Sequence, residues 1–465
     1  MLETDYLIVG SGAVGMAFAD VLLTETDANM IIVDKFSKPG GHWNVAYPFV
    51  TLHQPSAFYG VSSKELDKGR KDEIGLNKGM NELATGAEIM AYFDEVMRHR
   101  FLPSGRVKYF PLCDYQGNGQ FASMITGEVF EVKVNKKTVD ATYLKTQVPS
   151  THTPNFTIAP AVQFIAINDL VRITEPPTGF VVIGGGKTGI DACLWLLEQQ
   201  VDPDKITWIK SRDGWLLDRQ NTQPSMDFFE STIGAQAAQF EALAAATSID
   251  DLFDRLEAKG VLLRIDPTVR PTMFHAATVS QLELAQLRRI KNIVRLGRVQ
   301  RIEKDQIILD QGTIPTNLGQ IHVDCSAIAI PNIAIKPIFA GDLITPQTVR
   351  SYQPVFSAAF IAHVEATYEG DAKKNEICQV VPLPNHDTDW IEMSAVFLMN
   401  QYNWNQDQAL RKWLFENRLD GFSQLMVNAP KDDEAKQAIK QRLRQYAMPA
   451  MMKLQQFMAE LSQKP

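Results

Sequence analysis

The sequence predicts an α/β protein built around two parallel β-sheets, and three observations support that prediction. An apolar run at residues 6–9 is followed at once by the pattern Gly-x-Gly-x-x-Gly. A second apolar run, at residues 180–183, is followed by the same pattern of glycines. The chain also has 465 residues, which suits two or three domains better than one.

The first repeat is expected to form a complete strand–turn–helix–strand unit. Residues 6–9 suit a fully buried parallel strand, an apolar helix is expected over residues 16–23, and residues 30–33 suit the next strand. That strand ends at Asp34, where a carboxylate would accept a hydrogen bond from a ribose hydroxyl. The unit therefore predicts a Rossmann-like site for a dinucleotide.

The glycines have separate tasks in such a unit. Gly10 permits a tight turn, Gly12 lets the backbone approach a pyrophosphate, and Gly15 lets the helix pack against the strand. Ala13 stands at the start of the helix, whose free N–H groups point at the phosphates. A glycine-rich turn without a ligand is the alternative, and the strand and helix on either side argue against it.

The segment after Asp34 favours FAD over NAD as the first ligand. A second glycine pair, Gly40 and Gly41, follows soon afterwards, as in chains whose loop must pass close to the ribityl group and the flavin. The residues expected to contact FAD are Gly10, Gly12, Ala13, Gly15, Asp34, Lys35, Gly41, His42, Trp43 and Gln54.

The same segment resembles the flavin-containing monooxygenase and Baeyer–Villiger monooxygenase superfamily of FAD/NAD(P) oxidoreductases. Those proteins carry Gly-Gly-x-Trp followed by Tyr-Pro, as residues 40–43 and 47–48 do here. The resemblance implies that Trp43 and residues 52–56 lie near the flavin ring. An ordinary core aromatic at position 43 and a structural histidine at position 53 stay open as alternatives. The candidate catalytic residues are His53, Gln54 and His42.

The second repeat is expected to bind a nicotinamide dinucleotide. A helix is expected over residues 190–198, and residues 206–209 suit the strand after it. Residues 186–188 also match the tail of a P-loop, but that motif requires glycine at the position of Val181. The residues expected to contact this dinucleotide are Gly184, Gly186, Thr188, Gly189, Ser211 and Arg212.

The residues after the second strand favour NADPH over NADH. Lys210, Ser211 and Arg212 stand where NAD-binding units usually carry a carboxylate. A guanidinium can make two parallel bonds to phosphate oxygens, which suits the extra 2′-phosphate of NADPH. Asp213 adjoins these residues and weakens the preference, so NADH stays open.

Two separated fingerprints indicate two Rossmann-like dinucleotide-binding domains, with the NADPH domain interrupting the FAD domain. An apolar strand at residues 321–327 is expected to return the chain to the FAD domain. In two-dinucleotide flavoproteins a late helix N-terminus faces the flavin pyrimidine, and residues 354–357 are expected in that place. The expected boundaries are 1–175 and 320–402 for the FAD domain, 176–319 for the NAD(P)H domain with a helical insertion at about 213–292, and 403–465 for a helical C-terminal segment.

Two of these segments have open roles. The helical insertion either covers the active site or serves as a structural elaboration or oligomer contact, so a homo-oligomer stays open. The C-terminal segment is rich in methionine, which suits a packing surface better than a membrane-surface helix. Its methionines are Met448, Met451, Met452 and Met458.

The motifs predict an NADPH-dependent FAD oxidoreductase, and the resemblance implies a monooxygenase that acts on a small organic substrate with molecular oxygen. The superfamily's Phe-x-Gly-x-x-x-His fingerprint is absent from the crossing between the domains, where residues 150–156 stand instead. A flavoprotein reductase or dehydrogenase without oxygen transfer therefore stays open. So does a non-catalytic FAD-binding or nucleotide-sensing protein.

Composition argues against several other classes. The net charge is −8 and no long basic run occurs, so no nucleic-acid partner is expected. The longest apolar runs fall short of the about 18 residues of a membrane span, and the N-terminus leads straight into a strand, so a cytoplasmic protein is expected. The four scattered cysteines form no CxxC pair and no metal spacing, which predicts buried thiols and no metal.

Overall fold

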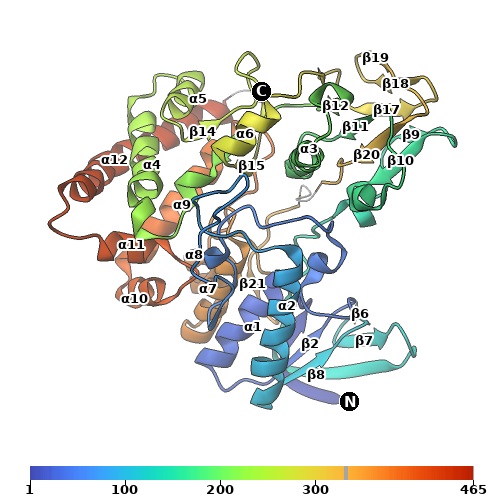
Figure 1. Cartoon of the computed structure of the whole chain (residues 1–465). Helices are drawn as coiled ribbons and strands as arrows, with labels where there is room; N and C mark the ends of the chain where they lie inside the picture. The colour runs from blue at the N-terminus through green and yellow to red at the C-terminus, as the bar shows by residue number, and fades with distance from the viewer. Residues whose placement is uncertain (329–332, 464–465) are drawn as a thin grey trace.

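The computed structural model describes residues 1–328 and 333–463. It is a mixed α/β protein, as expected, with two parallel sheets and a largely helical third part (Figure 1). The first sheet lies at the bottom of Figure 1, the second at the upper right, and helices α4, α5 and α12 at the upper left.

The first parallel sheet forms mainly from the N-terminal part of the chain. β1 (Leu2–Val9) lies between β8 (Val129–Asp140) and β2 (Met30–Val33), and β5 (Val107–Phe110) pairs with β2. All of these pairs are parallel, and every residue of β2 is buried, as its apolar run predicts. A hairpin of β6 (Cys113–Gly117) and β7 (Gln120–Ser123) continues from β8.

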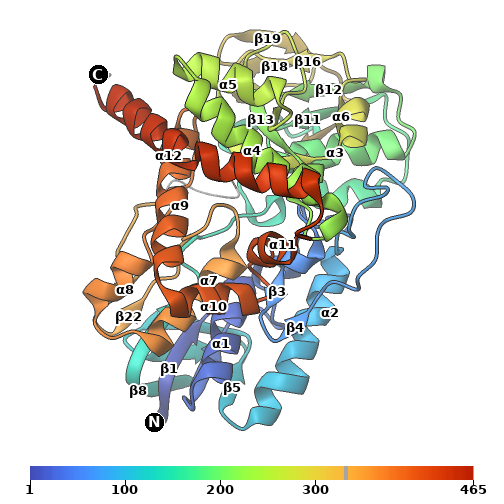
Figure 2. The same ribbon diagram turned by 90° about the vertical axis from the view of Figure 1, so that its left-hand side faces the viewer.

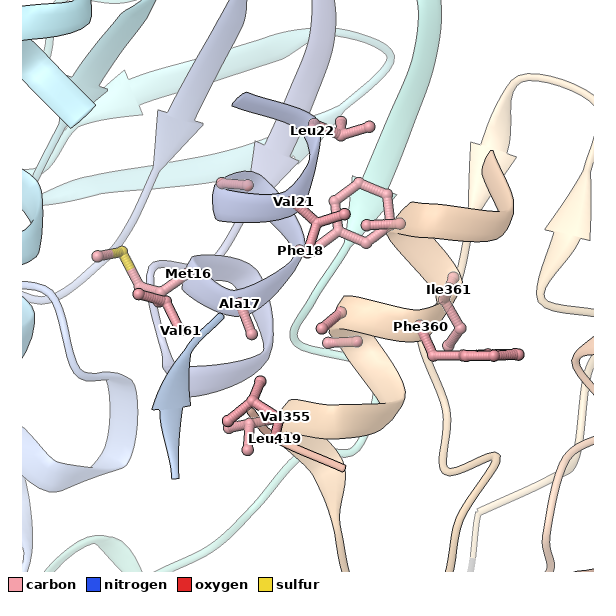
Figure 3. Close-up of a cluster of buried hydrophobic side chains, with 14 of the residues drawn as sticks. Met16, Ala17, Phe18, Val21, Leu22, Val61, Val355, Phe360, Ile361 and Leu419 are labelled. Carbon is pink, nitrogen blue, oxygen red and sulfur yellow. The ribbon is translucent and has the colours of Figure 1, made fainter. Parts of the chain in front are cut away.

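A late segment of the chain completes this first domain. Helix α1 (Ala13–Glu25), which follows β1, packs beside helix α7 (Pro354–Thr367). Figure 3 shows Phe18 and Val21 of α1 on the side that faces α7, and both are buried in one apolar cluster with residues of α7. Two short strands extend the sheet beside β8, and these are β21 (Phe339–Ala340) and β22 (Leu343–Ile344).

The second sheet is also parallel. Its strands, in spatial order, are β10 (Gln163–Ala166), β20 (Gln320–Asp324), β11 (Gly179–Ile183), β12 (Ile206–Ile209) and β16 (Ile293–Val294). Helix α3 (Lys187–Glu198) follows β11 after the second glycine pattern.

One strand expectation is wrong. The strand at residues 321–327 was expected to return the chain to the first domain, but β20 pairs with β11 and β10 in the second sheet. Ile321 and Val323 complete the apolar core between this sheet and α3, which explains why the strand stays there. The chain therefore returns to the first sheet only after β20, and β10 belongs to the second sheet although residues 1–175 were assigned to the first domain.

The insertion is not wholly helical, which corrects a second expectation. It contains a small sheet in which β13 (Gly214–Asp218) lies between β14 (Leu262–Leu263) and β15 (Met273–Val279). Six of the seven residues of β15 are buried, because both faces of this strand are covered. The helices of the insertion are α4 (Phe229–Ala245), α5 (Ile249–Ala258) and α6 (Gln281–Leu287).

The C-terminal segment is helical, as expected, and packs on the insertion. Figure 2 shows α12 lying along α4, and the two helices are in contact. The buried residues of α12 are Ile439, Ala450, Leu454 and Phe457, whereas Met448 and Met452 are exposed, so these two methionines are not the packing surface. The C-terminal helices are α9 (Asp389–Gln406), α10 (Gln408–Glu416), α11 (Phe422–Asn428) and α12 (Glu434–Ser462). Within the described ranges, no helix has the length and apolar character of a membrane span.

Candidate functional site

A single large cavity, of about 2500 Å³, borders both glycine patterns. The carboxyl ends of strands from both parallel sheets open into it, which is where ligands bind in open α/β sheets. Of the residues predicted to bind cofactors, only Gly15 and Gly189 do not line this cavity. Those that do are Gly10, Gly12, Ala13, Asp34, Lys35, Gly41, His42, Trp43, Gln54, Gly184, Gly186, Thr188, Ser211 and Arg212. The catalytic candidate His53 also lines it.

In the first glycine turn, a side chain at Gly15 or Gly41 would clash with the backbone of a neighbouring residue. A Cβ on Gly15 would lie 1.9 Å from the carbonyl oxygen of Gly10, so Gly15 keeps α1 against the turn. A Cβ on Gly41 would lie 2.9 Å from the Cα of Gly12, and Gly41 has a φ of +59°. The two glycine loops therefore touch, and α1 begins at Gly12 with no side-chain cap on its free N–H groups.

Asp34 is fixed by the same turn. Its Oδ2 accepts hydrogen bonds from the backbone N–H of Ser11 at 2.5 Å and from the hydroxyl of Ser11 at 2.8 Å. Its Oδ1 accepts from the backbone N–H of Phe36 at 2.8 Å. Each carboxylate oxygen has more than one lone pair, so Asp34 can still accept from a ligand hydroxyl in the cavity that it lines.

The second glycine turn has the same construction. A Cβ on Gly189 would lie 2.1 Å from the carbonyl oxygen of Gly184, and the indole Nε1 of Trp208 donates to that oxygen at 2.8 Å. Gly186 begins α3 without a side-chain cap, and no atom lies within 4 Å of a Cβ added there. The N-terminus of α3 is therefore open toward the cavity, as an anion at this place would require.

The loop after the first unit forms one wall of the cavity. A short 3-10 helix, Gly41–Val45, carries His42 and Trp43, whose rings stack with centroids 5.3 Å apart. The indole Nε1 of Trp43 donates to the hydroxyl of Tyr59 at 2.7 Å. Trp43 also packs against the apolar clusters of both parallel sheets, so it is a core aromatic as well as a cavity residue.

A polar network that the sequence did not reveal joins this loop to α3. The hydroxyl of Tyr47 donates to Oδ2 of Asp191 at 2.5 Å, and Lys187 forms an ion pair with the same carboxylate. The only sequence signal was the Tyr-Pro pair, because residues 47 and 191 are far apart in the chain. Lys187 lines the cavity beside Thr188.

Two neutral histidines face the cavity. Burial lowers the pKa of His42 to about 4. Burial, assisted by the nearby charges of Lys187 and Arg219, lowers the pKa of His53 to about 3, although Asp191 opposes this. Within the described residues neither ring takes part in a hydrogen bond, and Nε of Arg219 donates to the backbone oxygen of His53, not to its ring. Both imidazoles are therefore uncharged at neutral pH and free to bond a ligand.

The charged residues after β12 are neighbours in the sequence but lie in different environments. Lys210 is buried and pairs with Asp213 at 2.5 Å, and Asp213 also accepts from Nε of Arg295 at 2.7 Å. The carboxylate of Asp213 is therefore occupied and does not compete with a 2′-phosphate. Ser211 and Arg212 line the cavity instead.

The expected role of the late helix is only partly matched. Gln353, Pro354 and Val355, at the N-terminus of α7, line the cavity. Ser357 does not line it, because its hydroxyl accepts from the backbone N–H groups of Val349 and Arg350 inside the protein. The helix end therefore faces the cavity through its first turn alone.

Sequence patterns missed the far wall of the cavity. It comes from β15, from residues 348–353 and from residues 383–389, which are distant in the chain. Two of its residues, Ala276 and Tyr352, have φ values of +49° and +57°, which L-residues rarely adopt. Such backbone strain concentrates at functional sites.

The thiols match the expectation. All four cysteines are free and buried, and burial raises the pKa of the Cys193, Cys325 and Cys378 thiols. Among the described residues, no group of histidine, cysteine and carboxylate side chains forms a metal site.

Comparison with known proteins gives close relatives and distant structural likenesses. No family model matches the chain. The uncharacterized protein Rv2000 of Mycobacterium tuberculosis is 50% identical over 425 residues, which cover 91% of this chain and 79% of that protein. The uncharacterized protein Mb2023 of Mycobacterium bovis gives the same values.

The solved structures are much more distant. The flavin-containing monooxygenase from Stenotrophomonas maltophilia is 11% identical with a TM-score of 0.43, over 81% of this chain and 100% of that chain. Cyclohexanone monooxygenase from Rhodococcus sp. Phi1, bound to NADP+, is 11% identical with a TM-score of 0.47, over 81% of this chain and 89% of that chain. The bacillithiol disulfide reductase Bdr (YpdA) from Staphylococcus aureus is 12% identical with a TM-score of 0.46, over 78% and 98%. The function of this chain must therefore be argued from its own residues.

Proposed function

We propose that this chain, which belongs to one protein family with the mycobacterial protein Rv2000, is a flavoprotein oxidoreductase that binds FAD at the first glycine turn and NADPH at the second. The observation that carries this proposal is the single cavity of about 2500 Å³ lined by both turns. Two dinucleotides held there would meet in one cavity, as hydride transfer between them requires.

The first turn fits FAD. Gly12 and Gly41 line the cavity without a side chain, so a pyrophosphate could approach their backbones, and the uncapped N-terminus of α1 favours its negative charge. Asp34 would accept from the adenosine ribose. Trp43 would contact the flavin from the wall of the cavity. When bound, FAD supplies the capacity to accept hydride and pass electrons on.

The residues around the proposed flavin position bind and orient it. His53 is neutral, so its imidazole can donate one hydrogen bond without adding a charge to the cavity. The first turn of α7 points its free N–H groups at the cavity, which favours negative charge there. Asp191 holds Tyr47 and Lys187 together, which fixes the loop of the first unit against the second.

The second sheet is proposed to hold NADPH. Its pyrophosphate would lie at the open N-terminus of α3, between Gly184 and Thr188. Ser211 and Arg212 would bind the 2′-phosphate. The nicotinamide domain is then defined by the second sheet, from β10 to β20, and the FAD domain by the first.

An absorption spectrum of the purified protein before and after anaerobic NADPH tests this proposal. We expect flavin absorption bands that NADPH bleaches and that NADH bleaches more slowly. Bound flavin that NADPH does not bleach would instead indicate a non-catalytic FAD-binding protein. Protein that purifies without flavin and binds none when FAD is added would overturn the proposal.

The finer proposal is a monooxygenase that acts on a small organic substrate. The Gly-Gly-x-Trp loop lines the cavity, and none of the four thiols has a disulfide partner that would serve a disulfide reductase. The second candidate is a reductase without oxygen transfer, and the altered crossing favours it. There His152, in place of the superfamily's pattern, lines the cavity and lies 3.4 Å from the hydroxyl of Ser326.

The fate of molecular oxygen separates these two candidates. With ¹⁸O₂ and a panel of small ketones, sulfides and amines, a monooxygenase incorporates label into an organic product in proportion to the NADPH consumed. A reductase instead consumes NADPH with a non-oxygen acceptor and leaves every panel compound unlabelled.

A further inference from the structure

A segment from outside the second sheet crosses the proposed NADPH site. Residues 383–389, which lead into α9, line the cavity next to Arg212. His386 forms an isolated β-bridge with Met273 at the start of β15. The segment therefore joins the end of β12, the insertion and the C-terminal helices at one point.

Asn385 is the centre of this junction. The guanidinium of Arg212 donates to the backbone oxygen of Asn385 at 3.3 Å and to its Oδ1 at 2.7 Å. Nε2 of His275 lies 3.2 Å from the same Oδ1. The turn itself is fixed, because Oδ2 of Asp389 accepts from the backbone N–H groups of Asn385 at 2.9 Å and His386 at 2.8 Å.

Two arginines in this part of the cavity have no ion-pair partner among the described residues. Arg212 and Arg298 both line the cavity, and no carboxylate lies within 4.0 Å of either guanidinium. Burial and the charge of Arg298 lower the pKa of Arg212, while Asp389 and Asp387 act in the opposite direction. By contrast, Arg295 is fully paired with Asp213 and Asp266.

The contacts also leave Arg212 able to bind a ligand. Asn385 takes one N–H of each terminal nitrogen, so the Nε–H and the second N–H of Nη2 stay free. Ring Nδ1 of His386 lies 3.5 Å from the same guanidinium. The guanidinium of Arg212 and the imidazole of His386 lie together, and Arg298 lines the same cavity without a counter-charge; such groups favour a doubly charged phosphate over a neutral ribose hydroxyl.

We propose that Arg298 and His386 join Arg212 in one subsite for the 2′-phosphate monoester of an adenosine ribose, with Asn385 as a positioning residue that orients Arg212. This inference rests on the proposed use of NADPH. It adds Arg298, which directly precedes β17 (Val299–Ile302), and two residues from the segment before α9 to a site that the sequence placed only after β12. The segment before α9 is thereby part of the cofactor specificity of the second domain.

The test is calorimetric binding of 2′,5′-ADP and ADP to the full-length, FAD-loaded protein. We expect Arg298→Ala to weaken 2′,5′-ADP about tenfold, the loss of one charge-assisted interaction, and to leave ADP nearly unchanged. Asn385→Asp should weaken 2′,5′-ADP more than Asn385→Ala does, because the new carboxylate would pair with Arg212 and repel phosphate. The matched control is Arg301→Ala, an exposed arginine near Arg298 that pairs with Glu303 and does not line the cavity.

The outcomes separate this inference from the proposed function. A wild-type protein that binds ADP and 2′,5′-ADP equally would overturn the use of NADPH and the inference with it. If Arg212→Ala weakens 2′,5′-ADP but Arg298→Ala and Asn385→Asp behave like the control, the subsite is wrong and the use of NADPH stands. Inorganic phosphate that competes as well as 2′-AMP would show a site for free phosphate and overturn the nucleotide assignment. FAD content and melting temperature, measured for each variant, identify any variant that fails to fold. His386→Ala tests the same subsite through a second side chain.

Discussion

At the residue scale, the structure shows which of the charged residues after β12 can reach a ligand. Its neighbours Lys210 and Asp213 neutralise each other inside the protein, so Arg212 is the cation of that trio that reaches the cavity. A guanidinium in such a place discriminates between ligands by a phosphate that one of them lacks.

Replacing Arg212 should therefore affect one nicotinamide cofactor and not the other. For Arg212→Ala we expect the KM for NADPH to rise about tenfold or more, with little change in the KM for NADH. Steady-state reduction of an artificial acceptor measures both. Arg172→Ala, an exposed arginine that pairs with Asp169, is the control, and equal effects on the two cofactors would refute the role in 2′-phosphate binding.

The neutral histidines make stability depend on pH in a defined direction. An unfolded histidine takes up its proton near pH 6.5, whereas His42 does so at about 4 and His53 at about 3 in the folded chain. Between these values the unfolded chain binds more protons, so the free energy of unfolding falls as pH falls from about 6.5 to about 4. In melting-temperature profiles, His53→Gln should flatten this decline, and a profile as steep as that of exposed His99→Gln would contradict the low pKa.

Two glycine substitutions show whether FAD binding requires the close contact between the Gly41 and Gly12 backbones. They also separate the effect of that contact from the effect of a positive φ. Gly41→Ala adds a Cβ that would lie 2.9 Å from the Cα of Gly12, at a φ of +59°. We expect the variant to purify with little FAD, because the two loops must separate. Gly69→Ala has the same positive φ, +67°, but no neighbour within 4 Å, so it should cost about 1 kcal/mol of stability and keep its FAD. FAD-to-protein absorbance ratios distinguish the two, and equal ratios would mean that close approach is not required.

At the element scale, the sequence predicted elements better than it predicted their partners. The two glycine units were predictable, because in each unit the last glycine packs on the first inside one short segment, Gly15 on Gly10 and Gly189 on Gly184. The sheet that β20 joins was not, since a short apolar parallel strand suits either sheet equally well. β15 was missed for the same reason: its run of buried residues at 273–279 lacks the alternation that marks a half-exposed strand.

The residues of the candidate site also fall into predictable and unpredictable groups. Residues in the two turns and the loop after β2 were predictable from local patterns. The contacts Tyr47–Asp191 and Arg212–Asn385 were not, because each joins residues more than a hundred positions apart through ordinary polar side chains. Only the fold brings such pairs together.

The bond between Tyr47 and Asp191 is the clearest link between the two parallel sheets at the level of elements. Tyr47 is buried and its hydroxyl donates to a carboxylate, so Tyr47→Phe should destabilise the protein by about 2 kcal/mol. We also expect a higher KM for NADPH, since Asp191, the ion-pair partner of Lys187, loses the hydroxyl that holds it in place. Chemical unfolding measures the first effect. Tyr402→Phe, an exposed tyrosine of α9 that does not line the cavity, should change neither quantity, and a Tyr47 variant that matched it would show that this bond does not connect the domains.

At the scale of the whole molecule, residues of the C-terminal segment contact both the loop after the proposed flavin wall and the chain just before α7. Arg418 donates to the backbone oxygens of Ala57 and Tyr59, in the loop that follows the proposed flavin wall. Arg350, just before α7, forms a buried ion pair with Asp420 at 2.6 Å. Because Tyr352 and Gln353 follow Arg350 and line the cavity, this pair connects the C-terminal helices to the cavity wall.

Breaking that buried pair should therefore affect both stability and cofactor retention. In Asp420→Ala the guanidinium of Arg350 stays buried without a counter-charge, which costs about 3 to 5 kcal/mol. Burial already lowers the pKa of Arg350, and its position over the ring of Phe356, 3.6 Å from the centroid, only partly compensates a lost carboxylate. We expect a lower melting temperature and faster release of FAD, followed by flavin fluorescence on dilution.

A second substitution shows whether the unpaired charge is the cause. The double variant Asp420→Ala with Arg350→Met removes both charges and should recover much of the lost stability, because an apolar side chain of similar length suits the cluster around Phe356 and Trp404. Glu416→Ala breaks an exposed pair with Lys412 at 3.8 Å and should change the free energy of unfolding by less than about 0.5 kcal/mol. If the double variant is no more stable than Asp420→Ala, the loss comes from the backbone turn at residues 420–423, where Asp420 also accepts from the N–H of Ser423, and the ion pair does not hold the cavity wall.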